Sequence, residues 1–259
     1  MVMMSVAGLR SRLAWRGHSV LKLALCLMPL AVQAQAGKVL ATDDFRHGLG
    51  SWRVESQAAD TRVEAHDGVL EVHATAGVTI WFREPFEGDY EIRFKATPVK
   101  ASFPGFPDRV SDLNFFWNAS TASGEDPSVI KADGSLNAYN PLNLYYVGLG
   151  ANGNRTTRLR RYDGTSARPQ ITGYADPPEV TPADDAGPLP AFARLEDGRP
   201  IQVRIRSLAP AADRAGLVVL ANDVPVFSWR DPAPYRKGWF AFRTTTSHFL
   251  ISDFSVIRL

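Results

Sequence analysis

Apolar residues recur at every second position in short runs along most of the chain, and turn residues separate these runs. Between positions 90 and 96, for example, Tyr90, Ile92 and Phe94 alternate with charged residues. A period of two predicts strands that bury one face and expose the other. The predicted strands span 52–55, 69–73, 79–83, 90–96, 112–118, 144–148, 157–162, 201–207, 217–221, 226–229, 239–244 and 249–258.

No stretch of the chain has convincing helical periodicity, so about a dozen strands in one domain predict an all-β sandwich or barrel. Asn222 and Asp223 predict a hairpin between two of the strands, although Val224 stands where glycine is usual. The proline-rich stretch 167–199 is too long for an ordinary connection. We expect a long loop there, either the rim of a binding site or a flexible linker.

Residues 1–36 are expected to be a cleaved signal peptide that directs the protein to the periplasm or the medium. Four basic residues precede an apolar run at 23–32, and Ala34-Gln35-Ala36 then offers small residues for cleavage. The run is too short and too interrupted for a membrane anchor. A lipoprotein signal around Cys26 is the other alternative, and apolar rather than small residues flank that cysteine.

Removal of this segment changes the formal charge from +2 to −2, because it carries four positive residues and no negative ones. Neither nucleic acid nor an anionic membrane is therefore an expected partner, and we expect a monomer. The single cysteine leaves with the segment, so residues 37–259 form one domain without disulfides. No cofactor is expected, although Asp43, Asp44 and Asp253 could hold a structural Ca²⁺.

The strand 112–118 separates an apolar face from a polar one. Leu113, Phe115 and Trp117 point one way, whereas Asp112 and Asn114 point the other. Applied to the other strands, the alternation predicts one face for binding a polar ligand. Its members are Asp112, Asn114, Asn118, Tyr145, Arg158, Arg160, Tyr162, Trp239 and Arg243, with His248 in the turn that follows.

Rings, amides and carboxylates together suit a sugar, since rings cover apolar sugar faces and amides bind hydroxyl groups. A guanidinium binds a carboxylate with two hydrogen bonds, so the arginines expected on this side favour a uronate. They are Arg155, Arg158, Arg160, Arg161 and Arg243. The alternative is an ordinary solvated surface on which these arginines pair with Asp163, Asp231 or Glu196.

The order of the segments resembles the concanavalin A-like jelly rolls, which are sandwiches of two antiparallel sheets. The resemblance rests on Asp43-Asp44-Phe45, the strand 90–96, the hairpin 217–227 and the closing segments 238–244, 247–249 and 251–256. With 114–118, 144–148 and 157–164, the chain is similar to an uncharacterised group of secreted bacterial proteins associated with polysaccharide breakdown. The resemblance implies a saccharide on the concave sheet and brings no established catalytic residues.

The resemblance includes glucanases and alginate lyases, but their signatures are missing here: Asp112 has no second acid in its strand. A retaining glycosidase needs two carboxyl groups about 5 Å apart. A polysaccharide lyase instead needs a cation for the uronate, a base and an acid. For a lyase, Arg160 or Arg243 would neutralise the uronate carboxylate. His248 would be the base, and Tyr145 would be the base or the acid. Glycoside hydrolysis and non-catalytic carbohydrate binding are the alternatives.

Overall fold

The longest strand, β17 (Lys237–Arg258), belongs to both layers of a β-sandwich in the computed structural model, which describes residues 37–177 and 186–259. Its first part pairs with β9 (Leu113–Ser120) and its second part with β6 (Tyr90–Val99). β4 (Val69–Phe82) runs antiparallel to both parts. Between them Thr246 has a φ of 48°, and the register shifts. This bulge redirects the strand from one layer into the other.

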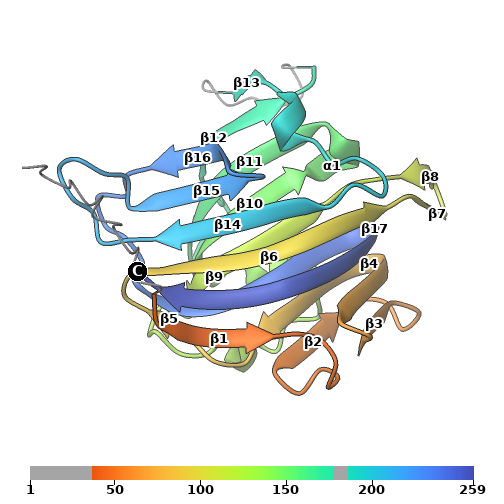
Figure 1. Ribbon diagram of the computed structural model, residues 1–259, viewed down its shortest axis with the longest axis horizontal. Coiled ribbons are helices and arrows are strands. Elements are labelled where there is room, and N and C mark those ends of the chain that lie inside the picture. Colours follow the sequence, from red (N-terminus) through yellow and green to blue (C-terminus); the bar gives the residue numbers. More distant parts are fainter. Residues whose placement is uncertain (1–36, 178–185) are drawn as a thin grey trace, which may run out of the picture. The chain divides into compact units, whose positions relative to one another are not determined.

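The hydrogen-bonded order of the main sheet is β13-β12-β11-β10-β9-β17-β6-β14-β15-β16. Figure 1 shows β14, β6 and β17 side by side in the nearer layer, with β9 and β10 in fainter colour behind them. The further strands of this order are β10 (Asn143–Gly150), β11 (Thr156–Asp163), β12 (Gln170–Ala175), β13 (Ala186–Pro188), β14 (Ile201–Ser207), β15 (Leu217–Ala221) and β16 (Val224–Trp229).

Short strands and single turns complete the described part of the chain. β1 and β5 pair with β17, β2 and β3 pair with β4, and β7 and β8 form a separate hairpin. The strands are β1 (Val39–Asp43), β2 (Trp52–Ser56), β3 (Arg62–His66), β5 (Phe86–Glu87), β7 (Ala101–Phe103) and β8 (Phe106–Arg109). The turns are η1 (Pro127–Ile130), η2 (Leu136–Tyr139), α1 (Ala151–Asn154) and η4 (Ala191–Ala193).

Inward-facing aromatic residues fill the space between the two layers. Trp52 is 2% exposed, and its ring contacts Phe45, Phe82, Phe242 and Phe254. Its indole Nε1 donates a 2.8 Å hydrogen bond to Asp43 Oδ2, so the buried polar atom is satisfied. This core joins β1, β2 and β4 to β17, which lies more than 150 residues further along the chain.

A second apolar cluster lies on the outer face of the layer that contains β9, β10 and β11. Phe116 and Tyr146 point outward there, and the segment between β9 and β10 covers them with Tyr139 and Leu142. Glu55 holds this cover in place, because it accepts hydrogen bonds from Trp81 Nε1 at 2.9 Å and from the Tyr139 hydroxyl at 2.8 Å. The outer face is thus only partly open to solvent.

The expected all-β sandwich of antiparallel sheets is confirmed, but several strand boundaries differ. The predicted strands 69–73 and 79–83 are one strand, β4, and 239–244 and 249–258 are one strand, β17. The hairpin at Asn222 and Asp223 forms with φ values of 48° and 66°, which a type I′ turn requires. No helix in the described residues is long and apolar enough to cross a membrane.

The stretch 167–199 is not a loop throughout, because β12 pairs with β11 and β13 runs parallel to β12. Its residues 178–185 and the expected signal peptide at 1–36 lie outside the described residues.

Replacement of Trp52 by alanine should remove these ring contacts and leave Asp43 without its indole donor. We expect the free energy of unfolding to fall by about 3–5 kcal/mol, as measured by urea denaturation. Val129→Ala is the control, since Val129 is 54% exposed. Equal stability of the two variants would contradict the role given to Trp52.

Candidate functional site

Four strands place a row of residues side by side on the outer face of the β9–β10–β11 layer. Asn114 of β9 is opposite Arg243 of β17 and Gly148 of β10, and Gly148 is opposite Arg158 of β11. In the next row, Tyr146 lies between Phe116 and Arg160. Because facing residues of paired strands point to the same side, these side chains share one surface.

This surface is hollowed into a cavity of about 370 Å³. The two rows, apart from Phe116, form its floor together with Tyr162, and Leu136 of the covering segment forms part of its wall. The described lining residues are Asp112, Asn114, Leu136, Tyr146, Gly148, Ala151, Asn152, Thr156, Arg158, Arg160, Tyr162, Ala167, Arg168, Arg243 and Thr245.

Gly148 makes room for two polar groups of the cavity because it has no side chain. A Cβ atom at this position would lie 2.6 Å from the Tyr146 hydroxyl oxygen and 3.0 Å from Asn114 Oδ1. Both atoms are therefore directed at the same small space above the glycine. Glycine within a strand often marks such a close approach.

The buried polar atoms of the floor that lack hydrogen-bond partners among the described residues include two in the first row. They are Asn114 Oδ1 and Arg243 Nε, in side chains whose residues are 1% and 5% exposed. A buried polar group without a partner costs stability. A ligand with donors and acceptors of its own would satisfy such groups.

The cavity carries an excess of positive charge. Arg158, Arg160, Arg168 and Arg243 line it, whereas Asp112 is the single carboxylate among its described lining residues. Arg160 donates to the Arg168 carbonyl at 2.7 Å, which holds its guanidinium beside the cavity. Burial, and then the charge of Arg160, lower the pKa of Arg158. An anion would relieve this crowding of like charges.

Burial raises the pKa of Tyr146 well above its ordinary value, although Arg243 and Arg160 act in the opposite direction. Its phenol is therefore protonated at neutral pH. Tyr146 can donate a hydrogen bond or a proton into the cavity.

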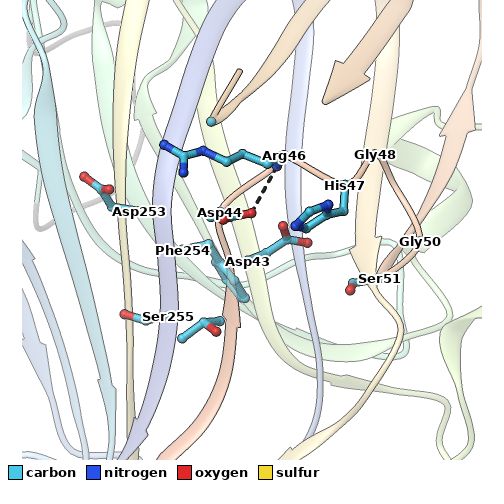
Figure 2. A pocket seen from close by; sticks show the side chains of 12 residues that line it. Asp43, Asp44, Arg46, His47, Gly48, Gly50, Ser51, Asp253, Phe254 and Ser255 are labelled. Carbon is cyan, nitrogen blue, oxygen red and sulfur yellow. Dashed lines mark hydrogen bonds between the residues drawn. The ribbon is translucent and has the colours of Figure 1, made fainter. Parts of the chain in front are cut away.

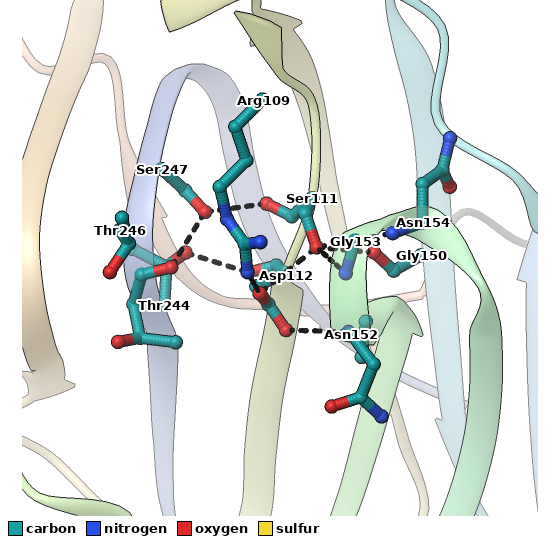
Figure 3. Close-up of polar contacts among 12 residues, drawn as sticks. Arg109, Ser111, Asp112, Gly150, Asn152, Gly153, Asn154, Thr244, Thr246 and Ser247 are labelled. Atoms are coloured by element: carbon teal, nitrogen blue, oxygen red, sulfur yellow. Dashed lines mark hydrogen bonds and ion pairs between the residues drawn. The ribbon is translucent and has the colours of Figure 1, made fainter. Parts of the chain in front are cut away.

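Asp112 is fixed in place by the polar network drawn in Figure 3. Its carboxylate pairs with Arg109, and Ser111 Oγ lies 2.9 Å from its Oδ2. Its backbone carbonyl accepts a 2.7 Å hydrogen bond from Thr244 Oγ1. Since Asp112 has a φ of 66°, these contacts also hold a backbone conformation that few residues adopt.

The turn α1 borders the cavity and is built from left-handed residues. Gly150, Asn152 and Gly153 have φ values of 59°, 55° and 72°. Glycine and asparagine adopt this conformation at low cost, which explains the sequence Gly-Ala-Asn-Gly-Asn at this place.

Residues 72–254 match the model of a protein family described as a domain of unknown function, DUF6250. The chain belongs to the DUF6250 family. The matched range includes the parts of β9, β10, β11 and β17 that form the cavity. No curated protein matches this DUF6250 chain by sequence.

Solved structures show the same fold at low sequence identity. A Bacillus subtilis protein of unknown function with a galectin-like fold has a TM-score of 0.64 at 18% identity, over 86% of this chain and 97% of that chain. The potassium-bound carbohydrate recognition domain of Emp46p has a TM-score of 0.54 at 12% identity, over 85% and 94%. These likenesses confirm the expected concanavalin A-like jelly-roll fold for this DUF6250 member.

Most residues of the predicted face do line the cavity. These are Asp112, Asn114, Arg158, Arg160, Tyr162 and Arg243. The sequence reasoning missed Tyr146, Gly148, Asn152 and Arg168. Gly148 was the available signal, because it shares strand parity with Tyr146 and a glycine in a strand indicates close approach.

The expected orientation of Tyr145 is wrong. Tyr145 points into the core between the layers, where its ring packs on Trp117 and its hydroxyl donates a 2.6 Å hydrogen bond to Asp231 Oδ2. Arg161 pairs with the same carboxylate at 2.8 Å. The alternative of an ordinary solvated surface predicted such a pair with Asp231. Tyr146 takes the outward position instead.

Asn118 is also turned away from the cavity. Its φ of 50° marks a bulge at which β9 loses strict alternation. Its Nδ2 donates to Ser207 Oγ at 2.9 Å and to the Tyr235 carbonyl at 2.7 Å, and its Oδ1 accepts from the Tyr90 hydroxyl. Asn118 therefore ties the two layers together.

Trp239 and His248 lie elsewhere on β17. Trp239 packs beside the outer apolar cluster, and its Nε1 donates to the Arg83 carbonyl at 3.1 Å. His248 Nε2 lies 2.8 Å from Glu71 Oε1, next to the ring of His73. It is beyond the bulge at Thr246, which separates it from the cavity.

A separate recess of about 720 Å³ lies at the chain ends where calcium was considered (Figure 2). Asp43 accepts from the Phe45 amide and from Trp52 Nε1, both at 2.8 Å, and Asp253 pairs with Lys95 at 2.8 Å. No group of three or more His, Cys, Asp or Glu residues in the described chain is arranged to hold a metal ion. Asp43 and Asp253 are thus already engaged by protein groups, and the calcium site stays a prediction.

The pair of His248 and Glu71 should make the stability of the fold depend on pH in the acid range. The hydrogen bond from His248 holds the pKa of Glu71 below its ordinary value of 4.5, so the carboxylate stabilises the fold above that value. We expect this contribution to disappear as the pH falls through the lowered pKa.

His248→Ala should accordingly lower stability at neutral pH and flatten the loss of stability below about pH 5, as followed by thermal melting. His47→Ala, at an exposed position, is the control. An unchanged pH profile for His248→Ala would exclude this linkage.

Proposed function

We propose that this protein binds an acidic saccharide, such as a uronate-containing polysaccharide, in the basic cavity and cleaves it by β-elimination. The observation that carries the proposal is the row of Arg243, Asn114, Gly148 and Arg158, with Arg160 in the adjoining row. This arrangement places guanidinium groups, an amide and a glycine without a side chain next to one another on one rigid sheet.

The charges of the cavity favour a carboxylate ligand. Among the described residues Arg160 and Arg243 form no ion pair, and Arg243 Nε is buried without a hydrogen-bond partner. A guanidinium presents parallel donors that match the two oxygens of a carboxylate. Asn114 Oδ1 can accept a hydrogen bond from a neighbouring sugar hydroxyl.

The size and the lining of the cavity suit sugar rings. Its volume of about 370 Å³ lies within the ordinary range for small-ligand sites. Tyr146 and Tyr162 offer aromatic surface, and Leu136 adds an apolar wall. An acidic polysaccharide also fits the export expected from residues 1–36.

The same groups can perform an elimination. Arg243 would neutralise the uronate carboxylate and the Asn114 amide nitrogen would donate a hydrogen bond to it, which acidifies the C5 proton. A base removes that proton, its electron pair forms the C4–C5 double bond, and the C4–O bond breaks. Tyr146, as a protonated phenol, would donate the proton that the leaving oxygen needs. Asp112 Oδ1 is the carboxylate oxygen that is not paired with Arg109 or Ser111, and it would accept the C5 proton in place of its long, 3.3 Å hydrogen bond from the Asn152 amide.

Hydrolysis of the glycosidic bond is less well supported. Both common hydrolytic routes use a pair of carboxyl groups. The described lining residues offer Asp112 alone, and Arg109 already pairs with it. Non-catalytic binding is the second candidate, and this engagement of Asp112 by Arg109 favours it.

Loss of the cavity arginines should weaken binding. Arg243→Ala and Arg160→Ala should each reduce affinity for acidic oligosaccharides more than roughly tenfold, because each removes a charged hydrogen-bond donor. Isothermal titration calorimetry measures the effect. Arg62→Ala on the exposed strand β3 changes the net charge equally and serves as the control. Equal affinities of all three variants would refute carboxylate recognition in this cavity.

Tyr146→Phe should separate binding from cleavage. The variant keeps the ring and loses the proton donor, so we expect near-normal affinity and a fall in turnover of about 10²–10⁴-fold. The assay follows the ultraviolet absorbance of the unsaturated uronate on a panel of acidic polysaccharides, beside the release of reducing ends.

Release of reducing ends without that absorbance would indicate hydrolysis instead of elimination. Binding of an acidic glycan with neither signal would identify a carbohydrate-binding module. No binding to any acidic glycan would reject the proposed function.

A further inference from the structure

A second hollow, of about 400 Å³, lies beside the cavity. The β7–β8 hairpin forms one side of it with Gly105, Phe106 and Arg109, and Gly153 and Asn154 of α1 form another. None of these residues belongs to the lining of the cavity.

The two hollows adjoin at two places. Asn152 lines the cavity, and the next two residues of the chain line the second hollow. Asp112 of the cavity forms an ion pair with Arg109 of the second hollow. A chain-like ligand that leaves the cavity across α1 would thus meet the hairpin.

Phe106 is presented to solvent in this second hollow. It is 46% exposed, although burial of a phenylalanine ring would stabilise the fold by about 1.5–3 kcal/mol. Gly105, with a φ of 78°, makes the tight turn before it, and Phe103 at the start of the turn packs on His73. The Arg109 guanidinium carbon lies 4.7 Å from the ring centroid of Phe106, which fixes the ring's position.

The opposite side of the hollow is held equally firmly (Figure 3). Ser111 Oγ accepts hydrogen bonds from the Gly153 amide at 2.9 Å and the Asn154 amide at 3.3 Å. The Asn154 side chain bonds the backbone of Leu195 in both directions, at 2.7 and 2.9 Å. Ser111 therefore sets the distance between the hairpin and α1, as it sets the position of Asp112.

We propose that Phe106 forms a second saccharide subsite, which stacks on the apolar face of the sugar unit next to the one in the cavity. This inference rests on the proposed function. Arg109 is engaged by Asp112, and Asp108 adds a negative charge at the hairpin, so this subsite recognises a ring face rather than a carboxylate. The ligand is then an oligosaccharide long enough to cross α1.

The test compares affinities for an acidic disaccharide and for a longer oligosaccharide of the same sugars. It uses the Tyr146→Phe background, so that the ligands are not consumed. Phe106→Ala should lower affinity for the longer ligand roughly tenfold and leave the disaccharide unaffected. Phe106→Tyr keeps the ring and should retain affinity. Phe192→Ala, at another exposed aromatic residue, is the matched control.

Equal losses for both ligands, or no loss for either, would overturn the subsite. So would a parent protein that binds the two ligands with the same affinity. Failure of the parent protein to bind either ligand would instead reject the proposed function. Thermal melting of each variant establishes that the fold is intact.

Discussion

The passage of β17 between the two layers is the constraint on which the rest of this DUF6250 structure depends. Side chains at the bulge fasten it to the start of β9: Thr244 Oγ1 donates to the Asp112 carbonyl and Ser247 Oγ to the Ser111 carbonyl, both at 2.7 Å. These bonds fix the register that places Arg243 opposite Asn114. A slip by one residue would turn Arg243 into the core and Phe242 out of it.

The same constraint explains what the sequence could and could not predict. Where strands alternate strictly, as at Asn114, Arg158, Arg160 and Arg243, a period of two is enough to assign the outer face. It fails where both parities are apolar, as at Tyr145 and Tyr146, because hydrophobicity then carries no information on direction. It also fails at and after bulges. Asn118 itself has a positive φ, and His248 comes two residues after Thr246, which also has one. The local sequence does not reveal such a shift.

The cavity concentrates positive charge in a protein that is otherwise slightly acidic after residue 36. Several arginines elsewhere are compensated by carboxylates, as Arg93 and Arg206 are by Glu91. Those of the cavity crowd together on one stiff sheet, where the fold must hold them against mutual repulsion. Arg109 links this region to the β7–β8 hairpin, because it contacts both Asp112 and the ring of Phe106. Arg109 therefore acts on both hollows, because it pairs with the carboxylate of the cavity and holds the ring of Phe106 in the second hollow.

Gly148 gives this arrangement an evolutionary consequence. A side chain at this position would collide with the Tyr146 hydroxyl and approach Asn114 Oδ1 rather than enter the core, so a single codon change could displace the polar groups of the cavity while the layers stay packed. A family member with a side chain at this position would be expected to keep the sandwich but to hold Tyr146 and Asn114 differently. Within the family, residue 148 is thus a place where ligand recognition and fold can evolve independently.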